Sequence, residues 1–195
     1  MQPSQWSHAT IRGVTEPIWL TSGAPGAGKS TVARALARRY PKAIVIEVDA
    51  LREWVVSGYA NPLDSWTPET QLQFTLAHQT AGATACLYAQ AGFAVVIDGV
   101  TTESDVPVYR FPFPPRKVLL RPTLDVALRR NVTRETKTFD TTVLEPATRR
   151  LFADLSEACP PEHGWIVLDS SAEGPDETVT RLLAESWGQL HRSAP

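Results

Sequence analysis

A short glycine-rich stretch near the start of the chain carries the residue types with the clearest chemistry. It consists of Gly23, Ala24, Pro25, Gly26, Ala27, Gly28, Lys29, Ser30 and Thr31. The stretch fits the P-loop pattern G-x-x-x-x-G-K-[ST], in which glycines let backbone N–H groups converge on phosphate oxygens. In this pattern the Lys29 amine reaches the β- and γ-phosphates, and the Ser30 hydroxyl binds Mg²⁺. The stretch is therefore predicted to bind a nucleoside triphosphate together with Mg²⁺.

The segments on either side of this stretch support the prediction. Residues 18–21 form a short apolar run typical of a buried strand, and residues 31–40 have the pattern of a helix. A helix that starts at the loop adds roughly half a positive charge at its N-terminus, which favours bound phosphate. The alternative is a glycine-rich turn without a ligand, and the strand–loop–helix order argues against it. The sequence has no Asn-Lys-x-Asp motif of the GTPases, which favours ATP.

A carboxylate and an arginine follow the next predicted strand, residues 43–48. Asp49 comes directly after this strand, and Arg52 follows about one helical turn later. A carboxylate at that point could lie across the cleft from the γ-phosphate and deprotonate an acceptor hydroxyl as a general base. Arg52 could hold an anionic group of the acceptor or steady the transferring phosphoryl group. The alternative for Asp49 is only to cap a short helix that begins at Ala50.

A second carboxylate, Asp98, ends the predicted strand at residues 93–97. An apolar strand that ends in an acid resembles the Walker-B arrangement, in which the acid holds Mg²⁺ directly or through water. The alternative is a capped turn with Gly99. The metal function is favoured, so Ser30 and Asp98 are the predicted Mg²⁺ residues.

A basic helix is predicted at residues 123–137. Arg130, Arg134 and Lys137 share one of its faces, and no acidic residue lies three or four positions from either arginine. Such a face can close over a nucleotide and neutralise charge in the transition state of phosphoryl transfer. The alternative is a solvated basic face. Arg130 and Arg134 are therefore predicted catalytic cations on a lid.

Five short apolar runs alternate with helical segments along the chain. The predicted strands are residues 18–21, 43–48, 93–97, 117–120 and 165–168, and the predicted helices are residues 31–40, 50–58, 68–90, 123–137, 144–159 and 175–190. Continuous apolar strands indicate a parallel sheet covered on both faces, and hence a doubly wound α/β fold. Ligands in such folds lie beyond the carboxyl ends of the strands, where Gly23, Asp49 and Asp98 all fall.

Two further segments have less specific patterns. In the predicted helix 68–90, one face carries Leu72, Leu76, Ala83 and Leu87, and this face is predicted to pack on the sheet. Residues 101–115 contain four prolines and are predicted to be a loop that faces the substrate. Glu103, Asp105 and Arg110 in this loop could contact the substrate, and Trp54, Tyr59 and Trp66 could stack on it or simply pack.

The composition is that of an ordinary globular protein. The chain has 195 residues, 43% of them hydrophobic and 21% charged, with a formal net charge of −2. We expect residues 1–16 to be a flexible arm and residues 17–195 to form one domain, with a lid around residues 123–145. Cys86 and Cys159 are expected to be small buried residues rather than a disulfide, and no apolar run is long enough for a membrane span. A cytoplasmic location is the expectation.

These motifs together resemble the P-loop kinase superfamily over roughly residues 18–183. Within it the resemblance is nearest to the ATP-binding proteins that include 5′-hydroxyl polynucleotide kinase of the phage type and chloramphenicol phosphotransferase. The resemblance implies a five-stranded parallel sheet, ATP phosphates on residues 26–31, Asp49 as general base and Arg52 at an acceptor phosphate. It also implies that Arg134 is an arginine of the lid. Residues 59–66 and 101–115 match nothing in this family pattern.

The sequence thus predicts a kinase that uses ATP and Mg²⁺ to phosphorylate a hydroxyl of a small molecule, such as a metabolite or an antibiotic. The small size and net negative charge favour a compact acceptor over a polymer. One alternative is a 5′-hydroxyl polynucleotide kinase, with nucleic acid as the substrate. Another is a nucleotide-dependent switch or adaptor that phosphorylates no substrate, although a switch has no need of an acceptor base at Asp49.

Overall fold

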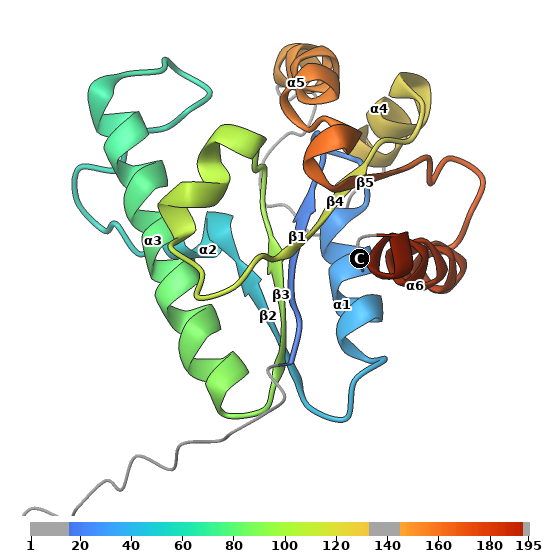
Figure 1. Ribbon diagram of the computed structural model, residues 1–195. Coiled ribbons are helices and arrows are strands. Elements are labelled where there is room, and N and C mark those ends of the chain that lie inside the picture. Colours follow the sequence, from blue (N-terminus) through green and yellow to red (C-terminus); the bar gives the residue numbers. More distant parts are fainter. Residues whose placement is uncertain (1–15, 133–144, 193–195) are drawn as a thin grey trace, which may run out of the picture.

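A five-stranded, all-parallel sheet forms the centre of the molecule. The computed structural model describes residues 16–132 and 145–192. The strands are β1 (Ile18–Ser22), β2 (Ala43–Glu47), β3 (Ala94–Asp98), β4 (Arg116–Leu120) and β5 (Trp165–Leu168), in the order β2-β3-β1-β4-β5. Both faces of the sheet carry helices (Figure 1), so the predicted doubly wound α/β fold is confirmed.

Side chains alternate along each strand between two buried faces. Trp19, Val96 and Val118 lie in the core shared with α1 (Lys29–Ala37) and α6 (Pro175–Arg192). Leu20 and Ile97 lie in the core on the opposite face, beneath α3 (Pro68–Gln90). Because both faces are buried, the strands read as continuous apolar runs.

The remaining helices gather near the carboxyl edge of the sheet. The short helix α2 (Val48–Arg52) follows β2, and the 3₁₀ helix η1 (Glu103–Tyr109) follows β3. Helices α4 (Leu124–Val132) and α5 (Glu145–Ala158) lie beyond the carboxyl ends of the strands, at the top of Figure 1. A single 3₁₀ turn, η3 (Pro161–His163), leads into β5. Several helical segments therefore gather around the edge of the sheet where ligands are expected.

The helices differ from the predicted ones mainly at their ends. The first begins at Lys29, two residues earlier than predicted, directly after Gly28 in the left-handed conformation. The helix predicted at residues 50–58 is only α2, and η1 occupies part of the predicted loop 101–115. The predicted continuation of α4 to Lys137 lies outside the described residues.

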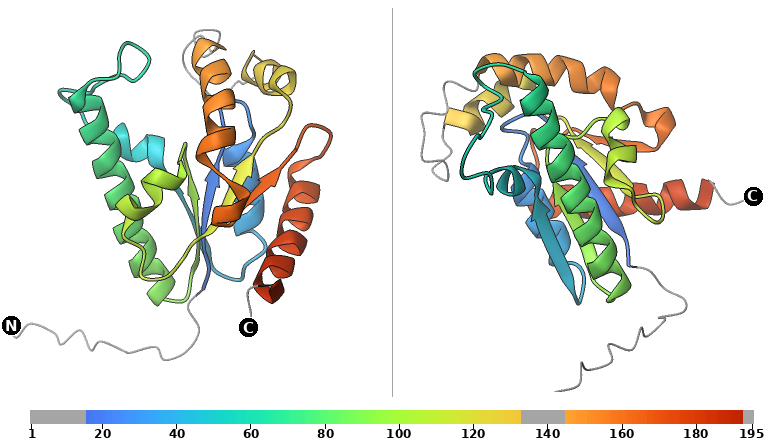
Figure 2. Two further views of the ribbon diagram at one scale, coloured as in Figure 1. Left: turned by 45° about the horizontal axis from the view of Figure 1, so that its top comes forward. Right: turned by 90° about the vertical axis from the view of Figure 1, so that its left-hand side faces the viewer.

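Helix α3 faces the sheet with its small residues, so the predicted packing of its leucine face is wrong. Leu72, Leu76 and Leu87 are 49%, 51% and 68% exposed, and the right-hand view of Figure 2 shows α3 from this outer side. The buried side carries Ala77, Ala81, Ala85 and Ala89 at a spacing of four. Small residues on this side let the helix axis lie close to the sheet and to η1.

Neither cysteine forms a disulfide. Cys159 is buried against β4 and β5, and Cys86 is half-buried on α3. Within the described residues, no helix is long and apolar enough to cross a membrane.

Candidate active site

The glycine-rich loop lies between β1 and α1 and is shaped by close backbone packing. Gly26 and Gly28 have φ angles of 80° and 92°, a region that residues with side chains rarely adopt. A Cβ atom on Gly26 would lie 2.1 Å from the carbonyl oxygen of Ala127 on α4. The loop can therefore pass this close to α4 only with glycine at this position.

The loop has the donors that a phosphate site requires. The amide of Ala27 closes a turn on the carbonyl of Ala24 at 3.0 Å, and the Lys29 amine donates to that same carbonyl at 3.3 Å. Helix α1 begins at Lys29, so the unpaired N–H groups of its first turn open beside the loop. No acidic residue occupies this first turn. These features fit a polyphosphate.

The two residues predicted to bind Mg²⁺ are placed at the same edge of the sheet. Asp98 ends β3 and pairs in register with Thr21 of β1, two residues before the loop, and Ser30 lies in the first turn of α1. The Asp98 side chain is only 6% exposed, yet it has no hydrogen-bond or ion-pair partner among the described residues. The Asp98 oxygens are not among the fully buried unpaired atoms of the described residues, so the carboxylate keeps some accessible surface. Its place at this edge, beside the P-loop, fits a cation ligand.

Mg²⁺ at this point would need further oxygen ligands. No group of three His, Cys, Asp or Glu side chains within residues 16–132 and 145–192 is arranged to hold a metal ion. Mg²⁺ commonly keeps several waters and binds through one or two protein oxygens together with substrate phosphates. The residues present fit that mode of binding.

Arg130 lies next to the glycine-rich loop. Its guanidinium donates to the carbonyl of Ser170 at 2.9 Å, and its Nη1 atom lies 3.7 Å from the position that a Cβ on Gly28 would take. The side chain thus joins α4 to the loop after β5 at the edge of the P-loop. Arg134 and Lys137 lie outside the described residues, so their predicted contacts stay predictions.

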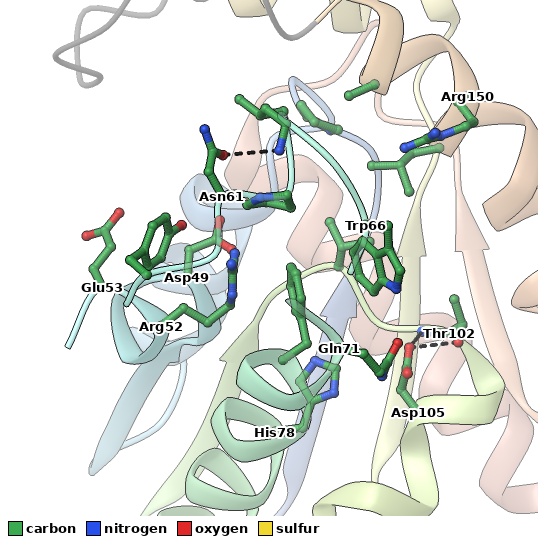
Figure 3. Close-up of a pocket in the computed structure, with 18 residues that line it drawn as sticks. Asp49, Arg52, Glu53, Asn61, Trp66, Gln71, His78, Thr102, Asp105 and Arg150 are labelled. Atoms are coloured by element: carbon green, nitrogen blue, oxygen red, sulfur yellow. Dashed lines mark hydrogen bonds between the residues drawn. The ribbon is translucent and has the colours of Figure 1, made fainter. Parts of the chain in front are cut away.

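A cavity of about 470 Å³ lies beside the P-loop and joins three of the predicted residues, Pro25, Asp49 and Arg52. Figure 3 shows side chains from α2, α3, η1 and α5 directed toward it. The lining that sequence analysis did not connect with this site includes Glu53, Asn61, Pro62, Leu63, Gln71, Phe74, His78, Val100, Thr102, Ala147, Arg150 and Leu151. Tyr59, Trp66 and Asp105, which the sequence singled out, also line the cavity.

Asp49 is the second residue of α2 and lies at the mouth of the cavity. The N-cap of this helix is Glu47, so the alternative that Asp49 serves only as the cap is wrong. Its side chain is exposed and has no hydrogen bond or ion pair among the described residues. The carboxylate is therefore available to an acceptor hydroxyl.

Arg52 is almost completely buried in the cavity wall, with 4% of its surface exposed. Its Nη2 atom donates to the carbonyl of Ala60 at 2.9 Å, and its guanidinium lies 3.9 Å from the ring centre of Phe74 and 5.1 Å from that of Tyr59. Its Nε atom is buried without a hydrogen-bond partner. No carboxylate within the described residues pairs with it. This site holds a cation with unused donor capacity.

His78 is the main site residue that sequence analysis missed. It is 4% exposed, its ring stacks on Tyr109 at 4.7 Å, and its Nε2 atom has no hydrogen-bond partner among the described residues. Burial lowers the pKa of His78, Asp105 acts in the opposite direction, and Arg52 adds to the lowering. The sequence offers little signal for its position, because its hydrophobic pattern favours the leucine face of this helix, and not the side that carries Ala77 and His78, for packing on the sheet.

Other candidates from the sequence lie outside the cavity. Glu103 is bound by the Lys117 amine and the Trp165 indole, each at 2.6 Å. Arg110 is an exposed residue that follows η1 in the left-handed conformation. Trp54 is 69% exposed and does not line the cavity.

The parallel sheet in the order 2-3-1-4-5 and the glycine loop after β1 define a P-loop protein of the kinase superfamily. This confirms the resemblance to the P-loop kinase superfamily drawn from the sequence. A family model described as "AAA domain" matches residues 18–157, and the chain belongs to this family. A comparison with curated proteins finds no match.

Several solved kinases have a similar fold. A sugar kinase from a Janibacter species has a TM-score of 0.64 at 19% identity, with 87% of this chain and 93% of that chain covered. Thymidylate kinase from Candida albicans has a TM-score of 0.67 at 12% identity, with 90% and 93% covered. A gluconokinase from Sinorhizobium meliloti has a TM-score of 0.59 at 19% identity, with 94% and 100% covered. At these identities the likeness concerns the fold.

Proposed function

We propose that this protein is a kinase that transfers the γ-phosphoryl group of ATP, with Mg²⁺, to a hydroxyl group of a small molecule. One observation carries the proposal: a single cavity joins the P-loop at Pro25 to the Asp49 carboxylate and the buried Arg52 guanidinium. Phosphate donor and acceptor would thus meet across one short gap. Kinases that act on small molecules, such as the sugar kinase and the gluconokinase, share the fold.

In this proposal Asp49 acts as the general base. Its carboxylate accepts the acceptor's hydroxyl proton as the hydroxyl oxygen bonds to the γ-phosphorus and the bond from that phosphorus to the ADP oxygen breaks. Arg52 holds an anionic group of the acceptor, which fixes the hydroxyl near Asp49. Such positioning can contribute several powers of ten to the rate.

The residues of the P-loop and its neighbours hold the donor. Residues 23–31 bind the phosphates through backbone N–H groups and the Lys29 amine, while Ser30 and Asp98 hold Mg²⁺. The metal ion supplies charge neutralisation on the phosphate oxygens when it is bound. Arg130 adds a positive charge beside the loop, and Arg134 is proposed to do the same from the lid.

The test is acceptor-dependent ADP formation by the full chain with ATP and Mg²⁺. A panel of hydroxylated acids, sugars and antibiotics serves as acceptors, and binding of a fluorescent ATP analogue is measured separately. We expect Asp49→Asn to lower turnover by about 10²–10⁴-fold with nucleotide binding retained. Glu53→Gln, a nearby carboxylate change in the same wall, is the matched control and should retain most of the activity.

Two results would point to the alternatives. Transfer to a 5′-hydroxyl oligonucleotide that is lost in Asp49→Asn would identify a polynucleotide kinase. Tight nucleotide binding with no acceptor-dependent turnover across the panel would favour a switch or an adaptor. Turnover unchanged in Asp49→Asn would refute the assignment of the base.

A further inference from the structure

The body of the cavity is apolar and partly aromatic. Trp66 and Phe74 stack with ring centres 5.1 Å apart and planes inclined by 22°. Leu63, Val100 and Leu151 add aliphatic surface from three different parts of the chain. Flat aromatic faces favour a ligand with a planar or apolar body, because stacking adds to the gain from burial of its surface.

Several polar groups in the wall are already engaged with one another. The Asp105 carboxylate accepts hydrogen bonds from the amide and hydroxyl of Thr102 at 2.8 and 2.7 Å. The Asn61 side-chain oxygen accepts from the amide of Leu63 at 3.1 Å. Figure 3 shows both of these contacts as dashed lines. These two side chains are therefore less available to the hydroxyls of a polyhydroxylated ligand.

Two deeply buried polar atoms in the same wall have no partner within the described residues. They are the Nε of Arg52 and the Nε2 of His78, and each side chain is only 4% exposed. Both side chains lie near Phe74, with the guanidinium 3.9 Å and the imidazole ring 6.2 Å from its ring centre. An anionic group matches the first and a hydrogen-bonding oxygen matches the second.

From these contacts we propose that the acceptor is a hydroxy acid with a planar, apolar body, rather than a polyhydroxylated sugar acid. Its ring packs against the exposed Trp66 and the aliphatic wall beside it. Its acid group binds the Arg52 guanidinium, and a polar atom of the ligand meets His78. Its hydroxyl points toward Asp49. This inference rests on the proposed function for the use of that hydroxyl, but binding of the ring and the acid is testable without turnover.

Three probes separate the features of the ligand. The first is 4-(hydroxymethyl)benzoate, which combines a ring, a carboxylate and a primary alcohol. The second is gluconate, which keeps the carboxylate and the primary alcohol but replaces the ring by a polyol chain. The third is 4-(hydroxymethyl)benzamide, which keeps the ring and removes the charge. Binding to the full chain, loaded with a non-hydrolysable ATP analogue and Mg²⁺, is measured by calorimetry or ligand-observed NMR.

The expected order of affinity follows from the cavity. The benzoate should bind at least about tenfold more tightly than gluconate, because only its ring can use the aromatic wall. The benzamide should bind about tenfold more weakly than the benzoate, since its neutral amide cannot form an ion pair with the Arg52 guanidinium.

A pair of tryptophan variants controls for the integrity of the fold. Trp66→Leu should weaken benzoate binding about three- to tenfold. Trp54→Leu removes another largely exposed tryptophan, which does not line the cavity, and it should change binding by less than about twofold. Both side chains are largely exposed, so neither change should threaten folding.

The outcomes distinguish this inference from the proposed function. The inference is overturned by gluconate binding as tightly as the benzoate, by equal effects of the two tryptophan changes, or by binding of none of the three probes. Gluconate phosphorylation without benzoate binding would overturn the inference and leave the kinase function in place. Selective benzoate binding, with no acceptor in the wider panel phosphorylated, would uphold the inference and reject the kinase function.

Discussion

Gly82 is a position at which α3 packs directly against the backbone of η1. A Cβ atom there would lie 1.9 Å from the carbonyl oxygen of Tyr109, 2.7 Å from its carbonyl carbon and 3.0 Å from its Cα. All three atoms belong to the backbone of η1, so no side-chain rotation can relieve the contact. Gly82→Ala therefore requires η1 and α3 to separate by about 1.5 Å before ordinary contact is restored.

The expected magnitude is a balance of two opposing effects. Alanine is favoured over glycine inside a helix by about 1 kcal/mol. Overpacking of a close contact costs about 1–3 kcal/mol, and the backbone contact at Gly82 places this change at the upper end. The net loss of unfolding free energy is thus about 2 kcal/mol, which corresponds to a fall in Tm of about 4–8 °C for a chain of this size.

Thermal and urea unfolding of the full chain measure this effect. Ala83→Gly, on the exposed side of the same helical turn, is the matched control and should cost only the intrinsic helix preference, about 1 kcal/mol. Because Tyr109 stacks on His78, Gly82→Ala should also weaken ligand binding in the cavity. A Gly82→Ala variant as stable as the parent, or more stable, would refute the close packing of α3 on η1.

Three further predictions concern stability. Thr67→Ala should cost about 1 kcal/mol in urea unfolding, because the Thr67 hydroxyl caps α3, whereas Thr67→Ser should retain most of the stability. Leu76→Lys should change stability by less than about 0.5 kcal/mol, while Ala81→Leu should cost about 1–3 kcal/mol. Equal effects of the two substitutions in thermal unfolding would contradict the orientation of α3. For Glu103, burial acts to raise the pKa of the carboxyl, but hydrogen bonds from Lys117 and Trp165 outweigh it and hold that pKa below the usual value of 4.5. The carboxylate therefore contributes stability above about pH 4.5, and this contribution is lost as pH falls through the lowered folded pKa. Glu103→Gln should lower stability near neutral pH by about 1–2 kcal/mol and flatten the acid limb of a pH series of urea titrations; an unchanged acid limb would contradict this account.

The parts of the fold that sequence analysis predicted correctly are those set by local patterns. The glycine spacing of residues 23–31 and the apolar runs of the five strands depend on neighbouring residues alone. The placement of Asp49 and Asp98 at one edge follows from the parallel direction of the strands, since the carboxyl ends then meet. These predictions needed no knowledge of side-chain packing.

The orientation of α3 could not be predicted from hydrophobicity. Its leucines favour burial by their size, but Ala77, Ala81 and Gly82 leave the only surface on which the helix can approach the sheet and η1 so closely. Steric fit therefore outweighed the apolar surface of the leucines. The decisive contact is with the backbone of Tyr109, more than twenty residues further along the chain.

The cavity beside the P-loop depends on contacts that no local pattern contains. Arg52 meets Phe74 from the next helix, and Leu151 closes the cavity from α5, about a hundred residues beyond Arg52. Each of these residues alone has an ordinary structural explanation in the sequence. Only the fold shows that they form one wall.

The state of Arg52 gives a physical reason to connect that wall with a ligand. Burial of a guanidinium costs several kcal/mol unless charge and hydrogen bonds compensate it. Among the described residues, the Arg52 guanidinium donates to one backbone carbonyl and packs against the faces of two aromatic rings. Its Nε has no hydrogen-bond partner. A side chain that served only stability would be better replaced by an apolar one of similar length, such as methionine. The arginine is thus best explained by an anion that binds in the cavity, and in the proposed function this anion would also bring its hydroxyl within reach of Asp49.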